Sequence, residues 1–216
     1  YIIKKIRLLL FTQVYNTINN MSPISAARLE PEFDSGLLQA QLTGLFENSW
    51  IEHVNQKDYQ GPWHVLPLRC AAENIDAHPI LQAFAIQQSG SYQNLPIIQN
   101  CTELLSLFDR LHTEVLSVRL MRLNSGAKIH PHCDNELSVE HQQARLHIPI
   151  KTNKGVAFKV NEHVLPMQAG ELWYINAHRT HSVKNHGDQA RINLVIDCKV
   201  NKWLQQQVHT AKHKIL

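Results

Sequence analysis

The sequence predicts a single α+β domain that is mainly β, in which short strands form a β-sandwich or jelly roll with helices packed on it. Strand-like segments follow one another from residue 113 to 198, and turn signals separate them at 152–155, 168–170 and 186–188. Helical periodicity lies before and after this region. A chain of 216 residues is long enough to bury one continuous core.

The first half of the chain supplies a helix, a strand and a long connection. Apolar residues at helical spacing predict a helix that has Asp34 or Ser35 as its cap and ends near Trp50. Residues 63–69 alternate as a strand does. The polar stretch 71–99 is expected to be a long loop, the kind of segment that often serves as a lid or binding segment.

The second half supplies the jelly-roll strands. A short helix is expected at 103–111 and a strand at 113–123. Further strands are expected at 128–134, 144–151, 157–160, 163–167, 171–175, 181–185 and 191–197. A closing helix is expected within 200–216. The jelly-roll core therefore extends over about 113–198, with N-terminal and C-terminal helices packed on it.

Composition and charge limit the partners that we expect. The hydrophobic fraction of 44% and the charged fraction of 18% are those of a globular protein, and a net charge of +3 is too small to indicate nucleic acid. No stretch approaches the roughly 20 apolar residues that span a bilayer, so we expect no membrane partner. The four cysteines show no C-x-x-C pair, which favours free thiols and a cytoplasmic location.

The first twenty residues differ from the rest. The sequence begins with Tyr1, and Lys4, Lys5 and Arg7 precede a short apolar run that is too short for a signal peptide. Met21 could open the native protein. We therefore expect residues 1–20 to be an upstream extension and residues 21–216 to be one domain.

A His-x-Asp motif gives the first indication of function. In an extended strand His132 and Asp134 point the same way, while Cys133 faces the opposite side. A second imidazole from the distant strand that begins at His181 would complete the two-histidine, one-carboxylate face that holds non-haem iron(II). This set leaves positions open for a co-substrate and oxygen, so the pattern predicts a metal-dependent oxygenase.

Three other histidines compete for the metal. His130 shares the face of His132 on an ideal strand but lies about 7 Å further along it, so we expect it to flank the site. His178 and His186 compete with His181 for the place of the second imidazole, and His178 is expected in a turn.

Three residues on two strands could bind an anion. Arg191 shares a strand face with Asn193 and Val195, and an inward-facing arginine is costly unless an anion pairs with it. A bound dicarboxylate would supply that anion. Arg145 and His147 share one face of their own strand and would point into the same cavity. The alternative is that Arg145 is a structural residue paired with an aspartate or glutamate.

Other residues are candidates for lining the substrate pocket. Trp63 and Arg69 lie an even number of residues apart on one predicted strand, so both could face the entrance, although Trp63 fits a core position equally well. Arg122 lies just before the metal strand. His130 and Trp173 complete this group.

Five segments together resemble the aspartyl/asparaginyl β-hydroxylase domain family. They are the His-x-Asp motif at 132–134, Arg-Leu-His-Ile-Pro-Ile at 145–150, Gly-Glu-Leu-Trp at 170–173, His-Ser-Val-Lys-Asn at 181–185 and Arg-Ile-Asn-Leu-Val-Ile-Asp at 191–197. The resemblance covers about 118–198. It implies a double-stranded β-helix, the cupin-like form of the jelly roll, that binds iron(II), 2-oxoglutarate and O2.

The resemblance also implies roles for individual residues. It implies metal ligation by His132, Asp134 and His181, and binding of 2-oxoglutarate by Arg191, with Arg145 and His147 matching residues that contact co-substrate or substrate. The animal enzyme that names the family lacks the carboxylate ligand. Because Asp134 is present, the chain looks more like the bacterial branch that includes free-proline hydroxylases. The implied activity is hydroxylation of an amino acid or peptide, and the alternative is a non-catalytic cupin-like metal-binding or sensor domain.

Overall fold

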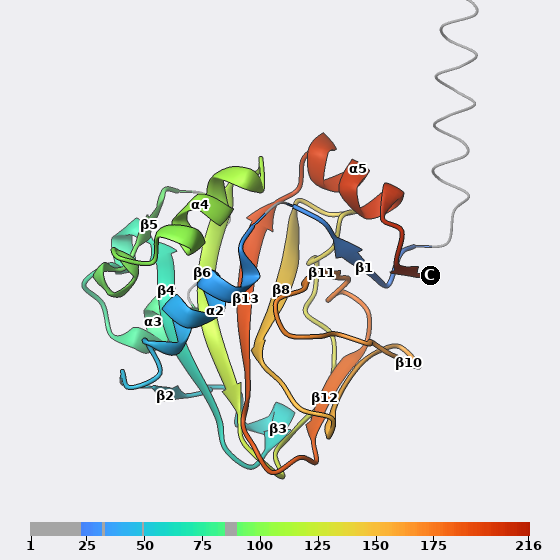
Figure 1. Cartoon of the computed structure of the whole chain (residues 1–216), viewed down its shortest axis with the longest axis horizontal. Coiled ribbons are helices and arrows are strands. Elements are labelled where there is room, and N and C mark those ends of the chain that lie inside the picture. The colour runs from blue at the N-terminus through green and yellow to red at the C-terminus, as the bar shows by residue number, and fades with distance from the viewer. Residues whose placement is uncertain (1–22, 32, 49, 85–89) are drawn as a thin grey trace, which may run out of the picture.

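The computed structural model describes residues 23–31, 33–48, 50–84 and 90–216. The predicted extension at 1–20 lies outside these residues. Within them, strands form two facing sheets, and the mainly β, double-stranded β-helix fold expected from the sequence is confirmed (Figure 1). No helix of the described part is both long enough and apolar enough to cross a membrane.

The larger sheet contains nine strands among the described residues, and the smaller one contains five. The strands of the larger sheet are, in spatial order, β14 (Lys214–Ile215), β1 (Ala26–Leu29), β11 (Leu172–Ile175), β8 (Gln143–Lys151), β13 (Arg191–Lys199), β6 (Val115–Leu123), β4 (Trp63–Ala71) and β2 (Ile51–Glu52), with β5 (Tyr92–Asn94) also paired to β4. Those of the smaller sheet are β10 (His163–Val164), β9 (Val156–Val160), β12 (His181–Asn185), β7 (Lys128–His132) and β3 (Tyr59–Gln60).

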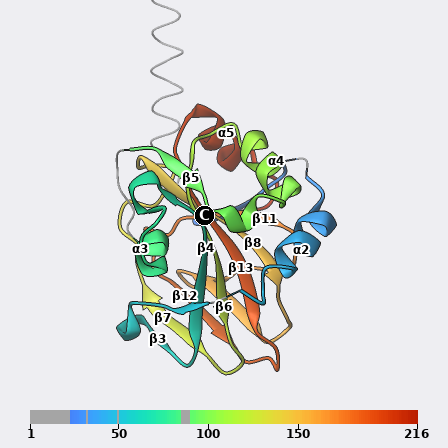
Figure 2. The same ribbon diagram turned by 90° about the vertical axis from the view of Figure 1, so that its left-hand side faces the viewer.

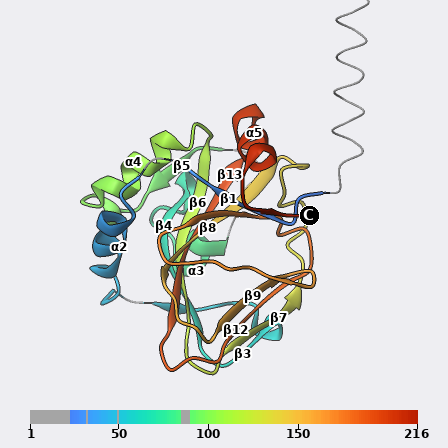
Figure 3. The ribbon, with the colours of Figure 1, turned by 45° about the vertical axis from the view of Figure 1, so that its right-hand side comes forward.

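Helices α2 (Ser35–Thr43), α4 (Thr102–Arg110) and α5 (Lys202–Thr210) cover one face of the larger sheet, and the smaller sheet lies on the other side (Figures 2 and 3). Helix α3 (Pro79–Phe84) lies on the side of the smaller sheet, where Phe84 reaches the space between the sheets. Short 3-10 helices occupy Gln56–Asp58, Ala72–Asn74 and Pro96–Ile98. Buried leucines of α2, α4 and α5 pack against the outward side chains of β4, β6, β8 and β13 in one core. The inward face of the sheet is left for a second, smaller core and for the site.

Strand alternation explains which residues face inward. On β13, Ile192, Leu194 and Ile196 lie in the helix-covered core, so Arg191 and Val195 project to the opposite face, toward the smaller sheet. The same parity holds on β8, where Leu146 and Ile148 face the helices and Arg145 and His147 face inward, and on β6, where Arg119 faces inward. Each of these strands therefore brings charged side chains into the space between the two sheets.

Element boundaries differ from expectation at a few places. Asp34 caps α2 by accepting a hydrogen bond from Leu37 N, but the helix ends at Thr43 rather than near Trp50. The expected loop at 71–99 contains α3, β5 and two 3-10 turns. The closing helix stops at Thr210, and the chain then adds β14 to the edge of the larger sheet.

Candidate active site

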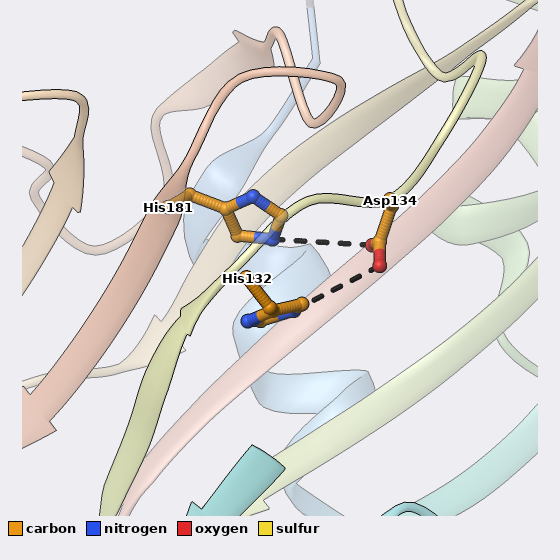
Figure 4. Close-up of side chains that lie close together, drawn as sticks. All are labelled: His132, Asp134 and His181. Carbon is orange, nitrogen blue, oxygen red and sulfur yellow. Dashed lines mark ion pairs between the residues drawn. The ribbon is translucent and has the colours of Figure 1, made fainter.

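Two histidines and one aspartate converge between the sheets. His132 ends β7 and lies opposite His181, the first residue of β12, as a cross-strand pair. Asp134 lies beyond the end of β7, where its backbone N donates to Ala177 O at 2.8 Å. One ligand atom from each of the three side chains lies within 4.8 Å of the others (Figure 4). The Nε2 atoms of His132 and His181 are 3.8 and 3.9 Å from the Asp134 carboxylate oxygens.

Backbone carbonyls orient both imidazoles. Nδ1 of His132 meets the carbonyl of His130 at 2.8 Å, and Nδ1 of His181 meets the carbonyl of Arg179 at 3.0 Å. A carbonyl only accepts, so each Nδ1 carries the proton and each Nε2 keeps its lone pair. Both lone pairs are therefore free to bind a metal at the candidate metal centre formed by His132, Asp134 and His181, called the centre below. Burial, followed by the effect of His132, lowers the pKa of His181 to about 4, which keeps this ring neutral at physiological pH.

A buried chain of charges holds Asp134. Arg145 donates Nη1 to Asp134, and it donates Nε and Nη2 to Asp197 at 2.7 and 3.2 Å. Asp197 is fully buried and also accepts from Arg119 Nη1 at 2.8 Å and from Ser117 Oγ at 3.0 Å. Each charge in the chain therefore has an opposite partner within hydrogen-bonding distance.

These contacts keep both aspartates ionised. Burial acts to raise the pKa of Asp134, but Arg145 and the two imidazoles lower it below its usual value. Burial acts in the same way on Asp197, where Arg119 and Arg145 hold the pKa well below the usual range. A carboxylate at the centre is thus available as an anionic ligand at neutral pH.

A cavity of about 280 Å³ adjoins the centre. The charged and histidine side chains that line it are His53, Asp58, Arg119, His132, Asp134, Arg145, His147, His181 and Arg191, and Trp63, Met121, Phe84, Phe158 and Val195 contribute apolar wall. One cavity therefore combines the metal-type ligands with three arginines.

Arg191 is the arginine without an anionic partner. It is 4% exposed, its guanidinium carbon lies 5.4 Å from the centroid of the Phe158 ring, and its Nη2 has no hydrogen-bond partner among the described residues. Burial lowers the pKa of Arg191 to about 10, so the group remains charged at neutral pH. His147 lies in the same cavity and meets Asn193 Nδ2 through Nδ1 at 2.8 Å. Burial, assisted by Arg191, lowers the pKa of His147 well below its usual value.

The sequence-based expectation for His130 needs correction at the smaller sheet. An ideal strand would place His130 and His132 on one face, but the register between β7 and β12 shifts, so Ile129 and His132 face the cavity. His130 instead lines a groove on the outer face of this sheet. His178 and His186 are exposed and lie outside the ligand cluster.

Three residues expected at the substrate pocket lie elsewhere. Arg69 follows a register shift in β4 and bonds to Val115 O and Asn94 Oδ1, outside the cavity lining. Arg122 faces the opposite side of β6 from Arg119, with its guanidinium carbon 4.5 Å from the Trp50 ring centroid. Trp173 is buried in the smaller core and donates Nε1 to Glu171 at 3.0 Å. Trp63 does line the cavity.

Sequence reasoning also missed several residues. Arg119 and Asp197 are charged positions with apolar residues directly before and after them in strands β6 and β13, and this interruption is a signal that could have identified them. The alternative that Arg145 is a structural residue paired with an aspartate agrees with the structure, since its three side-chain nitrogens all contact aspartates. His53 lies in an irregular segment after β2 and shows no sequence pattern that marks it.

Comparison with known proteins identifies the family to which this chain belongs. Over 97 residues the chain is 33% identical to L-proline cis-4-hydroxylase of Rhizobium meliloti (strain 1021), and the match covers 45% of this chain and 34% of that protein. An oxidoreductase of the 2OG-Fe(II) oxygenase family from Burkholderia pseudomallei has a similar fold, with 13% identity, a TM-score of 0.50 and coverage of 76% of this chain and 81% of that one. The family model described as aspartyl/asparaginyl beta-hydroxylase matches residues 36–200. The chain therefore belongs to the aspartyl/asparaginyl β-hydroxylase family.

Proposed function

We propose that this protein is an iron(II)- and 2-oxoglutarate-dependent dioxygenase that hydroxylates an unactivated C–H bond of an amino acid, free or within a peptide. One observation carries the proposal: two imidazoles and a carboxylate converge in a cavity that also contains the buried Arg191, whose Nη2 has no hydrogen-bond partner among the described residues. Membership of the hydroxylase family supports it.

The donor set of His132, Asp134 and His181 fits a divalent iron. The Nε2 atoms of the two imidazoles lie 3.8 and 3.9 Å from the carboxylate oxygens, and one ligand atom of each side chain lies within 4.8 Å of the others. Two imidazole nitrogens and one carboxylate are the donor set of non-haem iron(II) sites, so these three side chains would hold such an ion.

Arg191 and His147 fit 2-oxoglutarate. The planar guanidinium of Arg191 is suited to a carboxylate, and its unpartnered Nη2 is a buried donor that such a group would satisfy. His147 lies beside it as a neutral ring. When bound, iron and 2-oxoglutarate supply oxygen activation coupled to decarboxylation of 2-oxoglutarate to succinate and carbon dioxide.

The remaining residues prepare the cavity. Arg145 holds Asp134 and so fixes the direction of the carboxylate, a role that we assign to it in place of the expected contact with 2-oxoglutarate. Apolar side chains exclude water from the rest of the space, and they are Met121, Ile129, Phe158, Val183 and Val195.

A small substrate suits the size of the cavity. Its volume of about 280 Å³ is slightly below the range of about 300–1,000 Å³ that is typical of small-molecule sites. The relative named L-proline cis-4-hydroxylase makes L-proline the first substrate to try.

Succinate release from 2-oxoglutarate tests the proposal. The purified protein would be incubated in air with iron(II), ascorbate and each of the amino acids or short peptides of a panel that begins with L-proline. We expect one member to raise succinate above the uncoupled level, and the increase to be lost in His132→Ala. The matched control is His163→Ala, which removes an exposed histidine on β10 and is expected to keep the activity. Absence of metal-dependent 2-oxoglutarate binding would contradict the proposal and favour a non-catalytic cupin-like binding domain.

A further inference from the structure

His53 reaches the cavity from outside the jelly-roll strands. It follows β2, and its backbone N donates to Trp63 O at 2.9 Å. Tyr59 Oη lies 3.0 Å from the carbonyl of His53 and donates to it or to Glu52. The side chain lines the same cavity as His132 and Asp134. The backbone of this residue is therefore fixed against the larger sheet while its ring faces the site.

Three aromatic rings hold the imidazole of His53 in place. Trp63 stacks on it with ring centroids 3.6 Å apart and planes 9° apart. Phe84 meets it edge to face at 4.7 Å, and Tyr59 does so at 5.9 Å. Packing on several sides leaves the ring little freedom to rotate, so the direction of its nitrogens is set in advance.

The hydrogen bonding of His53 identifies its free donor. Asn55 N donates to Nδ1 at 3.3 Å, so Nδ1 is the acceptor and the proton of the neutral ring is on Nε2. Burial, followed by the charge of Arg119, lowers the pKa of His53 to about 3, which keeps the ring neutral. Nε2 has no hydrogen bond to a described residue and is not one of the fully buried unpartnered atoms, so it is open to the cavity. A ligand that enters the cavity can accept a hydrogen bond from this donor.

The position of the ring within the cavity indicates which ligand this is. The charges that act most strongly on His53 belong to Arg119, Asp134, His132 and Arg145. His53 thus faces the part of the cavity close to His132 and Asp134. This is the space left for the molecule whose C–H bond is hydroxylated.

We propose that His53 is a specificity-determining residue that donates its Nε2–H to a carboxyl oxygen of the amino-acid substrate. Trp63 and Phe84 hold the imidazole for this contact, and Arg119 supplies positive charge nearby that favours the same carboxylate. The inference rests on the proposed function, because it assigns the substrate side of the same cavity.

Substrate binding without turnover tests the assignment. The protein would be loaded with zinc in place of iron and with 2-oxoglutarate, and each amino acid of the panel titrated by calorimetry. His53→Phe keeps an aromatic ring but removes the donor, whereas His53→Gln keeps an N–H donor at a similar distance from the backbone. We expect His53→Phe to weaken the best-bound amino acid at least about tenfold and His53→Gln to stay within about threefold of wild type. The affinity for 2-oxoglutarate should be unchanged in both, and His163→Phe is the control for an exposed histidine.

The outcomes separate this inference from the proposed function. Equal substrate affinity in wild type and His53→Phe would overturn the role of His53 and leave the dioxygenase intact. Equal losses in the Phe and Gln variants would also overturn it, because they would show that packing rather than the donor matters. Failure of the wild type to bind any panel member would overturn it too, while metal-dependent 2-oxoglutarate binding in the same titrations would still support the dioxygenase.

Discussion

Replacing Asp197 by asparagine should destabilise the fold strongly. Asp197 is fully buried and is the shared partner of Arg119 and Arg145. Asparagine has nearly the same volume and keeps one acceptor oxygen, so the change removes the negative charge without opening a cavity. Arg145 retains Asp134, but Arg119 loses the only ion pair that it makes among the described residues.

The structure sets the size of this loss. Breaking a buried ion pair from one side costs about 3–5 kcal/mol, because the remaining charge stays desolvated. The retained amide oxygen favours the lower value, so we expect a loss of about 3 kcal/mol in the free energy of unfolding. For a domain of this size each kcal/mol lowers Tm by about 2–4 °C, which predicts a decrease of about 6–12 °C.

Urea unfolding of the metal-free protein, followed by tryptophan fluorescence, measures the loss. Ser117→Ala is the control that keeps the charge, since it removes a neutral hydroxyl that donates to Asp197 and accepts from Arg119, and it should cost about 1–2 kcal/mol. Arg119→Met combined with Asp197→Asn should be less damaging than the sum of the single changes, because the uncompensated charge is gone. A loss below about 1 kcal/mol in Asp197→Asn would show that the charge of Asp197 does not stabilise the buried arginines.

Three further predictions concern the site. Asp134→Ala should abolish amino-acid-stimulated succinate release and weaken metal binding in calorimetry, and circular dichroism should show a retained fold; unchanged turnover would exclude Asp134 as a ligand. Arg191→Met should raise the KM for 2-oxoglutarate at least about tenfold, the loss expected for a charged hydrogen bond, and should change the KM for the amino acid less; an unaltered KM for 2-oxoglutarate would remove the anchor role. Folding lowers the pKa of His53 from its usual value of 6.5 to about 3, so between these two pH values the unfolded chain binds a proton at His53 that the folded chain does not bind. The free energy of unfolding should therefore decrease from pH 7 to pH 4, and it should decrease less steeply in His53→Gln. If urea unfolding gave the same dependence on pH for wild type and His53→Gln, His53 would not be the cause.

Much of the fold follows from local signals. Alternation and turn residues placed β8, β12 and β13 within about two residues of their observed ends, because those strands are bounded by glycine- and asparagine-containing turns. Helix α2 ends before the position that the sequence predicts, because Phe46 and Trp50 continue the apolar pattern beyond the last residue of the helix. Both side chains still pack on the core. Tertiary packing can therefore extend a helical pattern beyond the helix.

Site residues could be predicted where they lie close together in the sequence, and not where the register between paired strands brings them together. His132 and Asp134 are two residues apart, and Arg191 begins the strand after His181. Arg119 and Asp197 meet only because β6 and β13 pair in a particular register, and their residue numbers alone do not give it. The bulge that turns His130 away from the cavity is likewise a property of strand pairing.

The most direct measurement of the central claim is an incubation with iron(II), 2-oxoglutarate and the stimulating amino acid under ¹⁸O₂, followed by mass spectrometry of both products. We expect one ¹⁸O atom in succinate and one in the hydroxylated amino acid, with the two products formed in equal amounts and absent with His132→Ala. Unlabelled succinate, or succinate formed without any hydroxylated amino acid, would contradict it.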